Sequence, residues 1–166
     1  LRFKLEGTRS QHHLLAQFDS GQKRFSDSRL LKGELGLQGG LHAVDQKNPS
    51  IAWEGALNLL KVEGLWWPAR SAVLEAPAPL LLAPGVQEIK NVVIRTEDGS
   101  TFKNTLLRVA EREIRVEGKA PKFLIPRLSP ILGKQVSVEP NNLYTNINWR
   151  YLATPDRVDG HVDVNH

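Results

Sequence analysis

The chain has 166 residues, a formal net charge of +4 and neither cysteine nor methionine. Its length suits one domain, and the lack of cysteine excludes disulfides, thiolate metal sites and cysteine nucleophiles. The 22 basic and 18 acidic residues are scattered along the chain, which argues against nucleic-acid binding.

No apolar run approaches the roughly 20 residues that a membrane-spanning helix needs, and no secretory leader is recognisable. Because the chain begins at Leu1 without a methionine, we interpret it as a segment of a longer protein. Any membrane anchor is then expected outside residues 1–166.

Strand-like stretches follow one another closely along the chain. In order they are residues 1–8, 11–18, 29–37, 51–62, 70–75, 79–82, 87–96, 101–108, 112–118, 135–139, 142–151 and 157–164. Most are separated by polar turn signals, namely Ser20-Gly21, Asn48-Pro49-Ser50, Asp98-Gly99-Ser100, Pro140-Asn141-Asn142 and Pro155-Asp156. Since no long helical pattern lies between the strands, the sequence predicts a largely antiparallel meander.

Residues 121–132 differ from the rest. Their apolar side chains fall at helical spacing, but Pro126 and Pro130 would interrupt a helix. Two interpretations are equally favoured: a short broken helix across the sheet, or an irregular apolar loop that closes one end of the core.

Apolar and polar residues alternate within the strands. Phe3 and Leu5 alternate with Lys4 and Glu6, and the pattern recurs near the C-terminus, where Val158, Gly160, Val162 and Val164 alternate with Asp159, His161 and Asp163. A period of two places one kind of side chain on each side of a sheet. Two further strands should present the apolar sets Ile51, Trp53, Leu57, Leu59 and Leu143, Thr145, Ile147, Trp149.

Candidate metal ligands have unsuitable spacing. Adjacent His12 and His13 would point to opposite faces of a strand, so we interpret them as ordinary strand histidines. Asp156, Asp159 and Asp163 lack the ligand spacing of a helix-loop-helix calcium site and are expected to be solvated hairpin charges.

No catalytic pattern is present either. Gly33, Gly36, Gly39 and Gly40 precede no helix that could bind a phosphate, and we attribute them to bends or bulges of a twisted sheet. The chain has no nucleophile elbow and no paired-carboxylate signature. The sequence therefore predicts a protein that is not an enzyme and has no metal or other cofactor.

Trp66-Trp67 precedes Pro68 and supplies two adjacent indoles. They could form a platform for a carbohydrate or a partner. The alternative, with one ring in the core and the other over a sheet edge, is favoured.

The order of several short motifs resembles the TamB family of translocation and assembly module subunits, within the wider AsmA-like group. The motifs span nearly the whole chain: residues 5–8 with 12–16, 35–41, 53–57, 76–80, 114–118, 124–132, 148–150 and 158–164. The C-terminal ones look like the recurring strand, tryptophan and glycine pattern of that family's repeats.

This resemblance implies a mainly β fold, a curved antiparallel sheet that forms an apolar trough or β-taco. It also implies a periplasmic protein anchored in the inner membrane of a Gram-negative bacterium. Such a protein would guide phospholipid acyl chains between the membranes and support outer-membrane protein assembly with an Omp85-type partner.

Candidate residues of the trough lining are Leu35, Leu37, Trp53, Leu57, Leu59, Ile114, Val116, Ile147, Trp149 and Val162. Two other functions stay open. Exposed strand edges could dock unfolded outer-membrane proteins as a chaperone does, or Trp66 and Trp67 could bind carbohydrate.

Overall fold

The computed structural model describes residues 1–19, 31–43, 50–64, 70–124 and 144–165. These residues form one eleven-stranded antiparallel sheet, and none of them is helical. The strands are β1 (Arg2–Gly7), β2 (His12–Asp19), β3 (Lys32–Ala43), β4 (Ile51–Glu63), β5 (Ser71–Leu74), β6 (Ala78–Ala83), β7 (Val86–Thr96), β8 (Thr101–Ala110), β9 (Glu113–Leu124), β10 (Tyr144–Thr154) and β11 (Arg157–Asn165). The expected fold class, a mainly β and largely antiparallel sheet, is confirmed.

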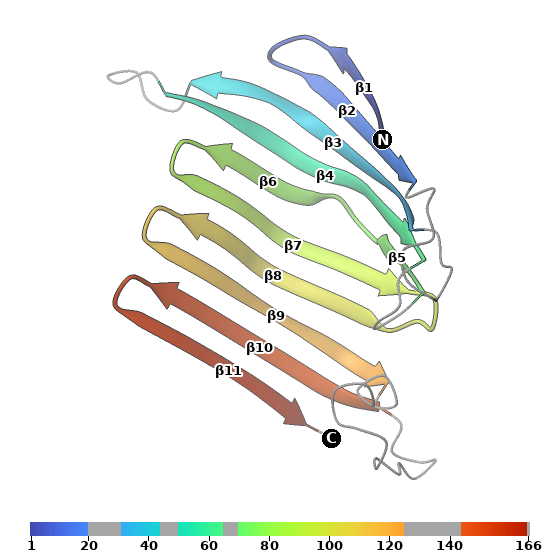
Figure 1. Cartoon of the computed structure of the whole chain (residues 1–166), viewed down its shortest axis with the longest axis vertical. Helices are drawn as coiled ribbons and strands as arrows, with labels where there is room; N and C mark the ends of the chain where they lie inside the picture. Colours follow the sequence, from blue (N-terminus) through green and yellow to red (C-terminus); the bar gives the residue numbers. More distant parts are fainter. Residues whose placement is uncertain (20–30, 44–49, 65–69, 125–143, 166) are drawn as a thin grey trace.

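Strand order in the sheet follows the order along the chain, as Figure 1 shows. The single departure is that β5 and β6 share one place between β4 and β7. The C-terminal part of β4 pairs with β5, and its earlier part pairs with β6. The strands that contact each other substantially are those that lie side by side in the sheet.

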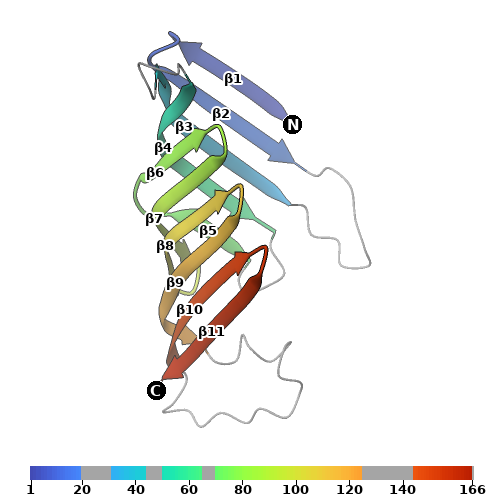
Figure 2. The same ribbon diagram turned by 90° about the vertical axis from the view of Figure 1, so that its left-hand side faces the viewer.

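The sheet is curved and twisted. Seen from the side in Figure 2, the strands turn progressively from β1 at one end to β11 at the other. This rotation is the accumulated twist of neighbouring strands, which L-amino acids impose with a fixed hand. The termini lie at opposite ends of the sheet (Figure 1).

Tight turns join the two strands of several hairpins. Asp98-Gly99-Ser100 forms a predicted turn between β7 and β8, where Gly99 has φ of 82° and its N–H donates to the Thr96 carbonyl. Pro155-Asp156 joins β10 to β11 as predicted. Two turns that were not predicted, Pro84-Gly85 and Glu111-Arg112, join β6 to β7 and β8 to β9.

Some strand boundaries differ from the prediction. Strand β3 continues through its glycines to Ala43, and β9 continues to Leu124. Residues 121–124 are therefore extended and do not begin a helix, whereas residues 125–132 lie outside the described part of the chain. The same holds for the predicted strand 135–139, for the turns at Ser20-Gly21 and Pro140-Asn141-Asn142, and for Asn48 and Pro49.

Directly paired residues of antiparallel strands point to the same side of a sheet. We call one side the apolar face. It comprises rows such as Leu5–Leu14–Leu37–Leu57–Ala78 and Leu80–Ile89–Leu107–Val116–Tyr151. The opposite side, which we call the polar face, carries rows such as Arg2–Gln17–Glu34–Lys61 and Glu88–Arg108–Arg115.

An irregularity in β4 overturns one predicted lining residue. Leu37 pairs with Leu57 and Gly36 pairs with Leu59, so Asn58 is an additional residue between them. A β-bulge of this kind changes which side the following residues face. Leu59 therefore lies on the polar face, and Leu60 takes the expected place beside Leu35.

Candidate functional site: the apolar face

The other predicted lining residues all lie on the apolar face. Each has an apolar residue or a glycine as a direct cross-strand partner: Leu35, Leu37, Trp53, Leu57, Ile114, Val116, Ile147, Trp149 and Val162. The topology thus brings residues from both halves of the chain onto one surface, which continues from β1 to β11.

The middle of this face is tightly packed. Leu57, Ala78 and Val92, from β4, β6 and β7, form a buried cluster, and Leu57 is only 7% exposed. Partly buried side chains surround it: Leu35, Leu37, Leu60, Leu74, Ile89 and Ile94. Farther along, Phe102 and Phe123 meet edge to face with ring centroids 5.6 Å apart, a favourable aromatic geometry.

Toward both ends the face is open to solvent. Phe3 and Leu5 on β1 are each 67% exposed, and Val158 and Val162 on β11 are 69% and 63% exposed. Exposed apolar residues are ordinary when scattered singly, whereas a continuous stretch of them marks a surface that binds something.

Aromatic rings cover glycines at three places on the face. Phe18 lies over its cross-strand partner Gly33, and Trp149 lies over its partner Gly118. Trp53 lies across the Gly39–Gly55 pair, since a Cβ on either glycine would come within 2.6 Å of its ring. The rings therefore lie close against the backbone, where a side chain on the glycine would exclude them.

Trp53 is also held by a hydrogen bond. Its indole Nε1 donates to Nε2 of His12 over 2.8 Å, and the His12 Nδ1 lies 3.2 Å from the Thr8 carbonyl oxygen. Because Nε2 accepts, the proton of a neutral ring is placed on Nδ1, where it donates to Thr8. His13 is exposed and pairs with Gln38 on the polar face, so the two histidines point apart as predicted.

A buried amide lies within the apolar face. Asn104 on β8 lies between Val92 and Gly118 in the register. Its Oδ1 is buried and has no hydrogen-bond partner among the described residues. A buried, unpaired amide oxygen is destabilising.

The polar face carries ion pairs within single strands. Residues two apart on one strand face the same way, and this spacing gives Lys4–Glu6, Lys61–Glu63, Lys90–Glu88, Arg115–Glu117 and Arg157–Asp159. The hydrogen bond from Lys61 lowers the pKa of Glu63, and the same bond raises the pKa of Lys61. These exposed pairs contribute little to stability individually.

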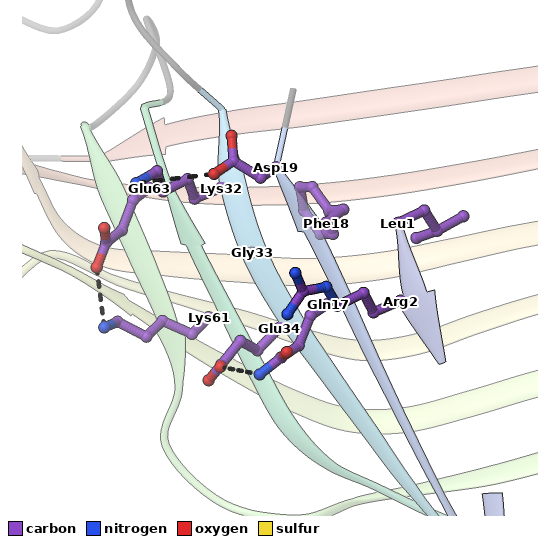
Figure 3. Close-up of a pocket in the computed structure, with 10 residues that line it drawn as sticks. All are labelled: Leu1, Arg2, Gln17, Phe18, Asp19, Lys32, Gly33, Glu34, Lys61 and Glu63. Atoms are coloured by element: carbon purple, nitrogen blue, oxygen red, sulfur yellow. Dashed lines mark hydrogen bonds and ion pairs between the residues drawn. The ribbon is translucent and has the colours of Figure 1, made fainter. Parts of the chain in front are cut away.

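A pocket of about 450 Å³ lies at one end of β1–β4 (Figure 3). Most of its charged side chains contact one another. Gln17 donates to Glu34 over 2.8 Å, Lys61 is 2.8 Å from Glu63, and Lys32 is 3.8 Å from Asp19. We interpret this pocket as a surface charge network beside Phe18, separate from the middle of the apolar face.

Within the described residues, no group of three or more histidine, cysteine, aspartate or glutamate side chains is placed to hold a metal ion. Asp159 and Asp163 bind Arg157 and His161, each over 2.9 Å. These two contacts lie along β11 and do not converge on a common point. No helix long and apolar enough to cross a membrane occurs in these residues.

Other candidates from the sequence lie outside the described residues, namely Trp66-Trp67 and Leu143. Sequence reasoning missed the Phe102–Phe123 contact between the far ends of β8 and β9, because Phe123 belongs to the segment that was expected to form a broken helix or a loop. It also missed Leu60, since the only local signal for the bulge was an asparagine within a leucine-rich strand.

Comparisons with protein-family models, with curated proteins and with solved structures give no match.

Proposed function

We propose that the apolar face binds acyl chains and guides them along the sheet as part of phospholipid transport between two membranes. The observation that supports this most is the continuous apolar surface of a single sheet, open at both ends and exposing Phe3 and Val162. In the wider proposal, which rests on the family resemblance, the chain works in the periplasm as part of an inner-membrane-anchored protein with an Omp85-type partner.

The energetics favour such a surface. Exposure of an acyl chain to water costs about 0.8 kcal/mol for each methylene, so a sixteen-carbon tail loses on the order of 12 kcal/mol. Contact with the side chains around Leu57 and Val116 would offset much of this cost. The contacts are of one chemical kind along the face, and uniform contacts favour movement of a chain over capture at one point.

Flat aromatic rings fit this role. Trp53 and Trp149 lie against glycine backbone, so each presents a broad apolar surface without projecting far from the sheet. A lipid tail could then pass over the rings as it passes over the neighbouring aliphatic residues.

Photocrosslinking tests the proposal with a matched pair of positions. Ile114 and Arg115 are adjacent and exposed on β9 but face opposite sides of the sheet. A photoreactive amino acid at position 114 should capture phospholipid in cells, and the same group at position 115 should capture much less. Equal capture at both positions, or none at position 114, would refute the lipid role.

Charge substitution needs an exposed lining residue. An aspartate at Leu57 would be buried in the central cluster, where an unpaired carboxylate unfolds the sheet. Ile114→Asp keeps its charge near solvent. We expect it to block lipid passage with little loss of folding, whereas Arg115→Asp on the other face should preserve passage.

A second candidate function is docking of unfolded outer-membrane proteins at a sheet edge. It is favoured by the outermost positions of β1 and β11, each of which pairs with one neighbour only among the described strands. Binding of extended peptides with no binding of lipid would support this function over the first.

A further inference from the structure

Among the described strands, β11 pairs on one side only, with β10. It is nine residues long and pairs with β10 in unbroken register, from Thr154–Arg157 to Asn146–Asn165. Proteins usually guard such edges with a short strand, proline, a bulge, an inward-pointing charge or repelling charged side chains. Strand β11 contains no proline or register shift, and its charges all lie on the polar face.

The charges along this edge are complementary to their own reverse. On the polar face, β11 carries Arg157, Asp159, His161 and Asp163 in order. The signs alternate from positive to negative, with His161 contributing when it is protonated. Read backwards, the order is negative, positive, negative, positive. Two antiparallel copies therefore bring Arg157 opposite Asp163 and Asp159 opposite His161.

The apolar side of β11 fits the same register. Val158 comes opposite Val162 of the second copy, and Gly160 comes opposite the second Gly160 at the centre. The two valines are now 69% and 63% exposed, and cross-strand contact between them would remove apolar surface from water.

We propose that β11 is an association edge, which pairs antiparallel with β11 of a second copy of this chain. The twofold axis passes between the two Gly160 residues, perpendicular to the sheet. Such an interface is closed, because each copy uses the same residues and no further copy can add to them. The rotation keeps both apolar faces on the same side, so the dimer presents one surface of twice the width.

The opposite edge is less suited to self-pairing. Strand β1 has six residues, and the antiparallel register that places Arg2 opposite Glu6 also brings Lys4 opposite Lys4. Like charges in direct opposition destabilise a strand pair. Pairing of β1 with β11 would instead give an open chain of copies. Lys4, which lies in β1, would then be part of the interface between copies.

Charge reversal with mixing tests the proposal, and the test does not depend on the lipid role. Arg157→Asp and Asp163→Arg each turn two attractive pairs of the dimer into repulsive ones. Both side chains are exposed, at 73% and 52%, so folding should survive, as circular dichroism can check. Sedimentation equilibrium at neutral pH should show reversible dimers of the unaltered chain. Each variant should raise the dissociation constant about tenfold.

Mixing the two variants should restore association. The Arg157→Asp copy then presents two negative charges to the two positive charges of the Asp163→Arg copy. Lys4→Glu serves as the control on the other edge and should leave the dissociation constant unchanged. The proposal is overturned if the chain of original sequence is monomeric, or if Arg157→Asp associates as tightly as that chain does. It is also overturned if the mixture of the two variants does not associate, or if Lys4→Glu weakens the dimer.

Discussion

Glycine 118 should be intolerant of even one added methyl group, whereas glycine 160 should accept it. Both lie on the apolar face and pair directly with an aromatic residue of β10, Trp149 and Tyr151 respectively. A Cβ on Gly118 would overlap the Trp149 ring and lie 2.8 Å from the Lys103 carbonyl oxygen. On Gly160 the nearest atom would be Cδ2 of Tyr151 at 3.7 Å, an ordinary contact distance.

The two alanine variants should therefore shift stability in opposite directions. Gly118→Ala must displace either the indole or the backbone of β8, and overpacking of this kind costs about 1–3 kcal/mol. Gly160→Ala meets no obstacle and reduces the freedom of the unfolded chain, which should stabilise the sheet by roughly 0.5–1 kcal/mol.

Urea denaturation of dilute protein, followed by circular dichroism, measures both free energies of unfolding. A double variant, with Gly118→Ala and Trp149→Leu together, shows whether the Trp149 ring causes the loss of stability. If the ring is the obstacle, Gly118→Ala should cost less when Trp149 is also replaced by leucine, and the coupling should exceed the error of additivity, about 0.5 kcal/mol. Equal stability of the two alanine variants would refute the packing of Trp149 on Gly118.

Three more substitutions test individual interactions. His12→Leu removes the acceptor of the Trp53 indole N–H and should cost about 1–3 kcal/mol in thermal or chemical denaturation, while His13→Leu on the polar face should change stability by less than about 0.5 kcal/mol. Asn104→Leu replaces a buried amide whose oxygen has no partner among the described residues and should raise the free energy of unfolding by about 1 kcal/mol; a decrease would show that this oxygen has a partner. Lys61→Met should raise the lowered pKa of Glu63 toward its ordinary value in an NMR titration. Since that pKa is lowered in the folded state, the pair stabilises above the unfolded pKa and loses its effect as pH falls through the folded one.

Period-two alternation was sufficient to predict most of the sheet. It holds without interruption in β1 and β11, so the sides of Phe3 and Val162 could be assigned from the sequence alone. Turns with a strong local signal, such as the one at Gly99, could also be predicted from the sequence. Pro84-Gly85 is a turn signal of comparable strength.

Positions beyond a bulge could not be predicted in this way. Asn58 reverses the sides of the residues that follow it, so that Leu59 and Leu60 exchange roles. Lys122 has φ of 57° and lies in β9 where the pairing with β10 shifts register. Asparagine and lysine do not by themselves require a bulge. The bulges at Asn58 and Lys122 arise from the pairing of the strands and from the twist of the whole sheet.

Contacts in this molecule join each strand to its neighbours in the sheet. Its stability is then close to a sum of nearest-neighbour terms, as in repeat proteins. Local unfolding should start at the exposed strands β1 and β11 and proceed strand by strand toward the middle of the sheet. The strands around Leu57 and Val92 should unfold last. Amide hydrogen exchange should accordingly be fastest at the two ends and slowest in β4 and β7.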